Sequence, residues 1–190
     1  MPSVRVVKRN GEEPVLDIGC GYGWLSKLFD QYVGVDLDVN KVGMARKFGH
    51  KEFIVASIDY LPFQENTFKT AILYDVLEHL KNPSLAFEEV RRVSVKTIVA
   101  HVDFESWYRF FTHSRDHLWL PRPKIVTGIL KKMYDRVLYI KTSGLFTTPK
   151  WLNDILAKRF PNEIVYIAFR SKLDSKVSEY EYQRVAEKLE

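Results

Sequence analysis

Short apolar runs alternate with amphipathic segments along the first hundred residues. The runs have the length and the content of β-branched residues typical of buried strands; they lie at 15–18, 32–36, 51–55, 70–74 and 97–102. The segments between them have helical periodicity; they lie at 24–29, 40–48 and 82–92. Asp38 and Asn82, the latter followed by proline, are typical helix starts. This alternation predicts an α/β fold with a doubly wound, mostly parallel sheet and helices on both of its faces.

The second half of the chain is less regular. It has three predicted helices and two predicted strands: helices at 104–111, 125–134 and 148–159, strands at 136–140 and 163–170. A charged tail at 172–190 indicates a surface helix or a frayed end. We expect one domain over residues 1–190, with a ligand-binding half at about 13–101 and a substrate-side half at about 102–190. The pattern leaves open which strand lies at the sheet edge.

Composition narrows the class of protein. The chain has 190 residues, 46% of them hydrophobic, with a net charge of +5. Its lysines and arginines are scattered, so nucleic-acid binding is permitted but not indicated. No apolar run is long enough for a signal peptide or a membrane span, so we expect a cytoplasmic protein. The first strand begins after about a dozen residues, which predicts that no helix precedes it and that the ligand cleft is open.

A glycine-rich bend follows the first strand. Asp17 is followed by three glycines at alternate positions, Gly19, Gly21 and Gly23. Such a bend presents backbone amides to a ligand at the carboxyl end of a strand. A dinucleotide fingerprint needs glycine at position 24, where the chain has Trp24, and a carboxylate would repel phosphate. Asp17 therefore favours a ligand with a cationic amino group.

Cys20 is the only cysteine and lies inside the bend. We interpret it as a small residue that fits a tight turn, and disulfides have no role. The second strand also ends in an acid, Asp36, at the spacing where a carboxylate accepts hydrogen bonds from ribose hydroxyls. Leu37 follows it at the same site.

These segments resemble the class I S-adenosylmethionine-dependent methyltransferases, in the group called methyltransferase type 11. Val15 to Gly23 resembles the first motif of this family, and Val35-Asp36 resembles the end of its second strand. Residues 56–63 are similar to the segment that contacts adenine, and residues 68–80 to the fourth strand and its turn. The resemblance covers about residues 13–101. It implies a Rossmann-like fold and S-adenosylmethionine as the cofactor.

The resemblance also implies which residues bind the cofactor. The methionine end would contact Asp17, Gly19, Cys20, Gly21, Gly23 and Tyr74, the ribose Asp36 and Leu37, and the adenine Ser57, Ile58 and Asp59. Ser57 stands where the family usually has an acid against the adenine amino group. That contact is made by the serine hydroxyl, is taken over by Asp59, or is missing. For Tyr74 the alternative is simple packing against the bend.

Methyl transfer needs few catalytic side chains, because it is an in-line displacement that depends mainly on alignment. A proton acceptor for an oxygen or nitrogen nucleophile is expected beyond the fourth and fifth strands. His79 is the first candidate and His101 the second; Asp103, His113 and His117 are further ones. A structural histidine in the turn is the alternative for His79. Asp75, Glu78 and His79 resemble a metal-binding arrangement of some family members, but we predict no metal.

The motifs shared with the family do not identify the methyl acceptor. We expect a small molecule methylated at oxygen or nitrogen. Aromatic residues between 104 and 119 form either a lid over this acceptor or ordinary core. The alternatives are an RNA methyltransferase, and a non-catalytic binding subunit that keeps the fold as a scaffold. The oligomeric state is left open.

Overall fold

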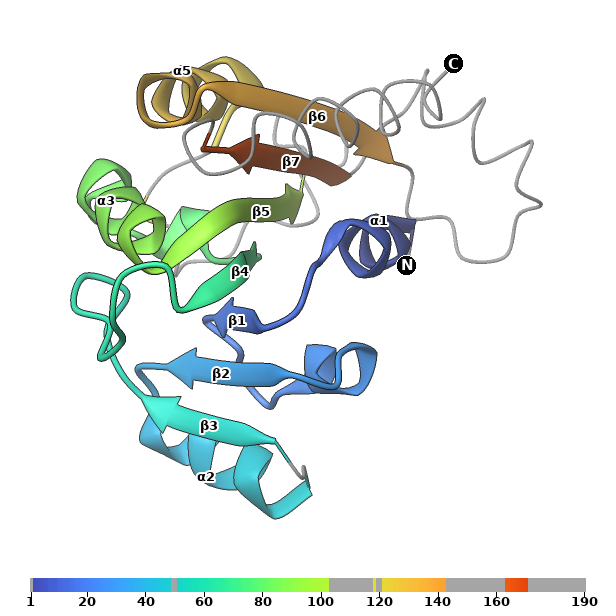
Figure 1. The fold of residues 1–190 in the computed structure, drawn as a ribbon, viewed down its shortest axis with the longest axis vertical. Helices are drawn as coiled ribbons and strands as arrows, with labels where there is room; N and C mark the ends of the chain where they lie inside the picture. The colour runs from blue at the N-terminus through green and yellow to red at the C-terminus, as the bar shows by residue number, and fades with distance from the viewer. Residues whose placement is uncertain (1, 49–50, 103–117, 119–120, 143–162, 171–190) are drawn as a thin grey trace.

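The computed structural model describes residues 2–48, 51–102, 118, 121–142 and 163–170. Its centre is a seven-stranded sheet in the order β3-β2-β1-β4-β5-β7-β6 (Figure 1). The strands are β1 (Val15–Ile18), β2 (Tyr32–Asp36), β3 (Glu52–Val55), β4 (Phe68–Tyr74), β5 (Ser94–Val102), β6 (Arg136–Thr142) and β7 (Glu163–Phe169). The first five are parallel, whereas β7 runs antiparallel to both β5 and β6. The predicted mostly parallel sheet is confirmed, and its two edge strands are β3 and β6.

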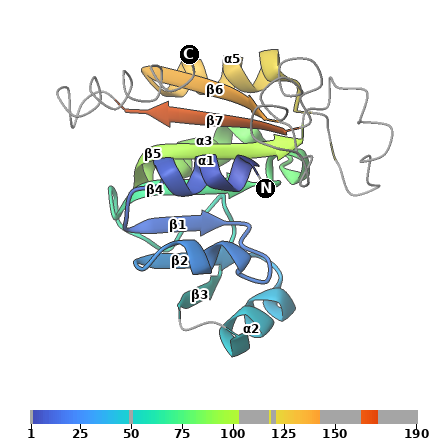
Figure 2. The same ribbon diagram turned by 90° about the vertical axis from the view of Figure 1, so that its right-hand side faces the viewer.

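Helices cover both faces of this sheet, as predicted. One face carries α1 (Pro2–Asn10), the 3₁₀ helix η1 (Trp24–Leu28) and α2 (Val39–Phe48); the other carries α3 (Pro83–Val93) and α5 (Pro123–Met133). Figure 2 shows α1 in front of the sheet and α3 behind it. A short 3₁₀ turn, η2 (Leu77–His79), follows β4. From β1 to β5 the order of elements therefore matches the alternation seen in the sequence.

Each face of the sheet has its own apolar core. Val7 of α1 and Leu25 of η1 pack with Ile72 and Ile98 on one face. Phe87 of α3 and Leu130 of α5 pack with other strand residues on the opposite face. All four residues of β1 are buried, because a parallel strand between two helical layers has no face turned to water.

Polar caps begin the helices where the sequence predicts them. Asp38 Oδ1 accepts hydrogen bonds from the backbone amides of Asn40, at 2.8 Å, and Lys41, at 3.3 Å. Asn82 Oδ1 accepts the amide of Leu85 at 3.3 Å, and Pro83 occupies the first turn of α3. These caps satisfy amides that a helix leaves unpaired, which explains why α2 and α3 begin within a residue or two of the predicted positions.

The expectation that no helix precedes the first strand is wrong. The nine residues of α1 make about two and a half turns. Val7 is fully buried, and the hydroxyl of Ser3 lies 2.6 Å from that of Tyr74. A helix this short is marginal alone, so packing against the sheet stabilises it. The expectation of an unusually open cleft thereby loses its basis.

Several predicted features lie outside the described residues. They are the helices at 104–111 and 148–159, the tail at 172–190, Asp103, His113, His117 and the aromatic residues between 104 and 119, all of which stay predictions. Within the described part of the chain, no helix is long and apolar enough to cross a membrane.

Gly43 tests the packing of α2. A Cβ added at Gly43, inside this helix, would meet no atom within 4 Å. We expect Gly43→Ala to raise the free energy of unfolding by about 0.5–1 kcal/mol, because alanine loses less backbone entropy in a helix. Urea denaturation measures this. Gly34→Ala is the contrasting variant: its Cβ would lie 2.7 Å from the Phe53 ring, so it should destabilise. A lower midpoint for Gly43→Ala would contradict the prediction.

Candidate functional site

The predicted site residues gather at the carboxyl ends of the parallel strands. Parallel strands end on the same side, so the bend after β1, Asp36 at the end of β2, the loop after β3 and the turn after β4 are neighbours there. Four segments that are far apart in the sequence thus meet at the carboxyl ends of the strands, where open α/β sheets bind ligands.

The bend requires its three glycines for different reasons. Their φ angles are +71° at Gly19, +54° at Gly21 and +75° at Gly23, values that other residues rarely adopt. A Cβ at Gly19 would lie 2.5 Å from Val76 Cγ2, and one at Gly23 would lie 2.5 Å from the Phe53 ring. A Cβ at Gly21 would meet nothing within 4 Å. Gly21 is therefore the glycine beside which a ligand has room.

The amides of the bend do not point to a ligand as the sequence analysis expected. The amides of Gly19 and Cys20 both donate to the Val35 carbonyl, at 2.8 and 2.9 Å. The amide of Gly21 donates to Asp36 Oδ2 at 2.8 Å. Because β2 binds three successive donors, the bend is poorly suited to phosphate. This agrees with the rejection of a pyrophosphate ligand.

Asp36 is held by backbone groups on both of its oxygens. Besides the Gly21 contact, its Oδ1 accepts the amide of Asp38 at 2.9 Å. Each carboxylate oxygen can accept a further hydrogen bond. Leu37, next in the chain, is 73% exposed, and Tyr22 in the bend is 66% exposed. The site thus combines a pre-oriented, half-buried acid with exposed apolar surface, as binding a sugar and a flat ring requires.

Asp17 lies deeper than predicted. Its side chain is only 2% exposed, and its Oδ2 accepts a hydrogen bond from the Tyr32 hydroxyl at 2.5 Å. Burial raises the pKa of Asp17 to about 7 and the Asp36 charge adds to this, whereas the Tyr32 hydrogen bond opposes it. Asp17 therefore changes charge near neutral pH beneath the bend. Contact with a ligand amino group stays a prediction.

Cys20 has the packing role that the sequence suggested. Its side chain is 3% exposed, and a Cβ at Gly34 would lie 2.9 Å from its Sγ. Burial, together with the nearby charges of Asp17 and Asp36, raises the pKa of the Cys20 thiol to about 12. A thiol so hard to ionise is a poor nucleophile, so Cys20 contributes to the shape of the bend and not to its chemistry.

The predicted adenine segment is a tight turn after β3. Ser57 and Tyr60 form an isolated bridge, and the amide of Asp59 donates to Ser57 Oγ at 3.3 Å. Ser57, Ile58 and Asp59 are all half-buried, and Tyr60 is 81% exposed. The Ser57 hydroxyl already accepts one backbone amide, and its proton remains available to an acceptor.

Tyr74, at the end of β4, packs against the residue that follows the bend. Its ring meets Trp24 edge to face with centroids 5.1 Å apart, and its hydroxyl contacts Ser3. Burial raises the pKa of the Tyr74 hydroxyl, and the Glu163 charge adds to this. The structure thus contains the packing alternative for Tyr74, and a contact with the methionine end stays a prediction.

The turn after β4 carries acids and the first candidate base. Asp75 has φ +53°, a strained value for a residue other than glycine. The protein around the Asp75 carboxyl removes water from it and so raises its pKa to about 7. The charges of Glu78 and Glu163 raise this pKa further. Glu78 is 3% exposed, while His79 is exposed on η2. Among the described residues, no three acids, histidines or cysteines form a group that could hold a metal ion.

His101 is the last but one residue of β5, at the carboxyl end of the sheet as predicted, but it is buried there. It is 1% exposed and stacks on Tyr166, with ring centroids 5.5 Å apart. The structure therefore brings the bend, Asp36, the turn after β3 and His79 to the carboxyl end of the sheet, whereas His101 is buried at that end. Tyr32 and Val76, which support the bend, were missed by the sequence analysis. Nothing in a strand pattern distinguishes a tyrosine that reaches an acid on the neighbouring strand.

Comparisons with known proteins agree with this geometry. The sequence profile of a family described as "Methyltransferase domain" matches residues 16–97. An uncharacterized protein of Methanocaldococcus jannaschii is 38% identical over 80 residues, which are 42% of this chain and 32% of that protein. The chain spans less than half the length of the curated relatives that it matches first.

Solved structures show the same fold. A Thermotoga maritima protein, described as a SAM-dependent methyltransferase and possible histamine N-methyltransferase, has a TM-score of 0.70 at 19% identity, over 88% of this chain and 87% of that chain. A putative methyltransferase of Haloferax volcanii, in complex with the methyltransferase activator Trm112, has a TM-score of 0.65 at 15% identity, over 88% of both chains.

The different surroundings of the glycines predict different costs of substitution. We expect Gly21→Ala to lower the free energy of unfolding by about 1–2 kcal/mol, the cost of a left-handed backbone alone. Gly23→Ala should cost more, because its Cβ also collides with the Phe53 ring. Chemical denaturation of both variants measures the difference. Equal losses would show that the space beside Gly21 is not open.

Asp17 predicts how stability depends on pH. Its folded pKa of about 7 lies above the ordinary value of 3.8, so the native state holds an extra proton between these values. The resulting stabilisation is complete below about pH 4 and is lost as the pH rises through 7. We expect the free energy of unfolding to fall more steeply between about pH 4 and 7 in the wild type than in Asp17→Asn. Parallel curves for the two proteins would contradict this.

Proposed function

We propose that this chain, whose residues 16–97 match the profile of a methyltransferase domain, transfers a methyl group from S-adenosylmethionine to a small-molecule acceptor. The observation that carries the proposal is the pairing of Asp36 with the glycine bend. Backbone amides hold both oxygens of this acid beside Gly21, where a Cβ would meet only open space. Such an acid suits the two hydroxyls of a ribose, and the open space suits the sulfonium chain that continues from it.

The residues around Asp36 fit the remaining parts of the cofactor. Leu37 offers an exposed apolar side chain beside the ribose position, and Ser57 to Asp59 form a half-buried turn for the adenine edge. The methionine end would lie along Gly19 and Gly21, with Asp17 beneath. Cys20 and Gly23 would contribute by shaping the bend.

S-adenosylmethionine supplies an electrophilic methyl group bound to a sulfonium, which a nucleophile displaces in line. The chain's own contribution is alignment, since a well-oriented displacement needs no covalent intermediate. The bend and Asp36 orient the cofactor, and Tyr74 with Trp24 forms an aromatic wall next to the bend. Aromatic faces stabilise a sulfonium in the same way as other cations.

His79 is our candidate for the base that accepts a proton from the nucleophile. It is exposed on η2, which follows β4, whereas His101 of β5 is 1% exposed and stacks on Tyr166. A base must reach the proton that it removes, so His101 would need the core to open. An unchanged turnover of His79→Ala on its acceptor would remove His79 from the mechanism.

The acceptor itself defines the alternatives. RNA is the second candidate, because exposed Arg122, Lys124, Lys131 and Lys132 gather on and just before α5. Phosphate binding would make activity fall steeply with salt, so activity that is insensitive to salt would exclude RNA. A non-catalytic scaffold is the third candidate. The similar Haloferax volcanii structure contains a putative methyltransferase bound to an activator, which supports a partner subunit as a further candidate.

We also propose a cytoplasmic location for the protein.

Methyl-labelled S-adenosylmethionine identifies the acceptor class. The protein is incubated with the label and fractionated cell extract, and the label is traced into small-molecule, lipid, protein and RNA pools. Label in the small-molecule pool supports the proposal. Label in RNA supports the alternative, and label in no pool despite cofactor binding supports the scaffold.

Calorimetry with S-adenosylmethionine tests the binding site. We expect micromolar affinity for the wild type and about 10- to 100-fold weaker binding for Asp36→Asn, because hydrogen bonds to a charged acceptor are worth about 1.5–3 kcal/mol. Asp38→Asn is the matched control: it removes a charge two residues away, and asparagine still caps α2. Equal losses in both variants would contradict a specific role for Asp36, and no binding by the folded wild type would overturn the proposed function.

A further inference from the structure

The connection that leads from β3 to β4, a crossover past β2 and β1, contains no helix. Its residues, 56–67, include the turn proposed for adenine, Ser57 to Asp59. An irregular crossover leaves backbone donors and acceptors without regular partners, and these need other groups to satisfy them. Its position therefore depends on side chains from the elements next to it.

One end of the turn is bound to the ribose strand. The amide of Ala56 donates to the carbonyl of Asp36 at 3.1 Å. The backbone of the proposed ribose residue is thus joined directly to the start of the proposed adenine turn. The other end of the turn, at Leu61, is not bound to the sheet in this way.

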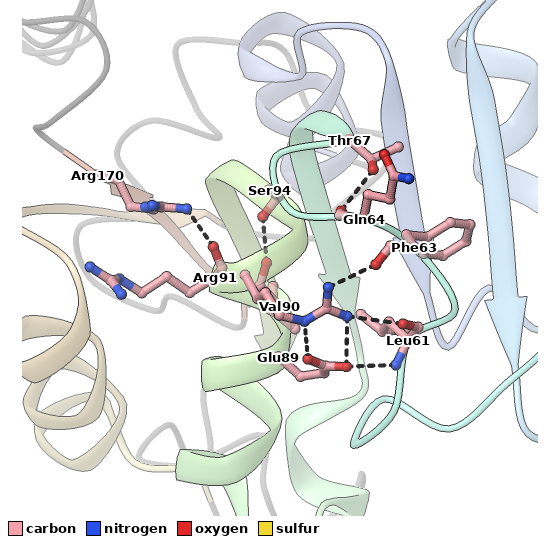
Figure 3. A network of polar contacts seen from close by, with 10 residues as sticks. Leu61, Phe63, Gln64, Thr67, Glu89, Val90, Arg91, Ser94 and Arg170 are labelled. Carbon is pink, nitrogen blue, oxygen red and sulfur yellow. Dashed lines mark hydrogen bonds and ion pairs between the residues drawn. The ribbon is translucent and has the colours of Figure 1, made fainter.

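Two side chains of α3 hold that other end (Figure 3). Glu89 Oε2 accepts the amide of Leu61 at 2.8 Å, and Arg92 Nη2 donates to the carbonyl of Leu61 at 3.0 Å. Arg92 Nη1 also donates to the carbonyl of Phe63 at 2.7 Å. Both polar groups of the Leu61 backbone are therefore bound by one pair of charged residues.

The pair is rigid because its members also bind each other. Arg92 Nε and Nη2 donate to the two carboxylate oxygens of Glu89, at 2.5 and 3.0 Å. The Arg92 hydrogen bond lowers the pKa of Glu89, so the carboxylate stays charged at neutral pH. A planar guanidinium that contacts a carboxylate and two carbonyls at once fixes direction as well as distance. Lysine has no such fork.

A second set of hydrogen bonds holds the crossover at Asn66. Asn66, at φ +56°, donates its amide to the carbonyl of Arg92 at 2.9 Å, and Arg170 binds both Asn66 Oδ1 and the carbonyl of Arg91. These contacts attach the later part of the crossover to the end of α3. They leave the Ser57–Asp59 turn to be positioned by Asp36 on one side and by Glu89 and Arg92 on the other.

We infer that Glu89 and Arg92 are positioning residues for adenine recognition: they hold Leu61 so that the Ser57–Asp59 turn is set against the adenine edge of the cofactor. The inference rests on the proposed function. Neither residue touches the ligand. Their effect is on the geometry of the turn, and thus on how well the protein distinguishes adenine from a base without its amino group.

The test compares two ligands that differ on that edge of the base: hypoxanthine carries a carbonyl and an N1 proton where adenine carries the amino group and an unprotonated N1. S-adenosylhomocysteine and S-inosylhomocysteine are titrated into the wild type, Arg92→Lys and Glu89→Gln by calorimetry. We expect each variant to bind the adenosyl ligand about 3- to 10-fold more weakly, the value of one hydrogen bond, while binding of the inosyl ligand changes little. The ratio of the two affinities should therefore shrink towards one.

Neighbouring positions on α3 supply the controls. Arg91→Lys and Glu88→Gln make the same chemical changes at exposed residues, and the hydrogen bonds from α3 to Leu61 and Phe63 come from Glu89 and Arg92 instead. They should keep the wild-type ratio. Hydrogen exchange of the amides at 57–61 should rise in Arg92→Lys and Glu89→Gln and stay unchanged in the controls. Two variants are used so that one that folds poorly does not decide the result.

The outcomes separate the two proposals. A wild type that binds neither ligand overturns the proposed function. A wild type that binds and discriminates, with variants that keep its ratio, overturns the inference alone, even if the variants are less stable. A ratio that shrinks equally in the controls would also overturn it, because the effect would then belong to α3 as a whole.

Discussion

The site depends on the way in which β2 holds the bend that follows β1. Three successive amides, those of Gly19, Cys20 and Gly21, donate to the carbonyl of Val35 and the carboxylate of Asp36. Left-handed backbone at the glycines makes this possible, since it turns neighbouring amides towards one strand. The same contacts orient Asp36. The shape of the bend and the direction of the acid are therefore one feature of the structure.

The burial of the Asp17 carboxyl beneath the bend costs folding free energy. Asp17 lies among apolar residues with Tyr32 as its hydrogen-bond donor, and its pKa of about 7 reflects the low polarity around it. A protonated Asp17 can accept from Tyr32 and still donate its own proton. Such a group is a source of pH sensitivity next to a site that we propose binds a cation.

The crossover after β3 shows how an irregular segment gains a defined position. Residues 56–67 have no helix, yet Ala56 is bound by Asp36 and Leu61 by Glu89 and Arg92. The ribose and adenine parts of the proposed site are thereby connected through backbone hydrogen bonds. A site built from several strand ends needs such connections, because each loop alone has many accessible conformations.

The sequence alone determined the β-α alternation, the helix caps at Asp38 and Asn82, and the glycine bend after the first strand, because periodicity, capping and turn preference are local properties. It also placed Asp36 correctly beside the bend. Only the tertiary structure decided that a nine-residue α1 is stable, that Asp17 is buried under the bend, and that His101 lies in the core. Glu89 and Arg92 read in sequence as an ordinary charged pair on a helix, three residues apart, and nothing local indicates that they bind a loop about thirty residues earlier. Contacts between distant segments depend on how the layers pack, which no local pattern encodes.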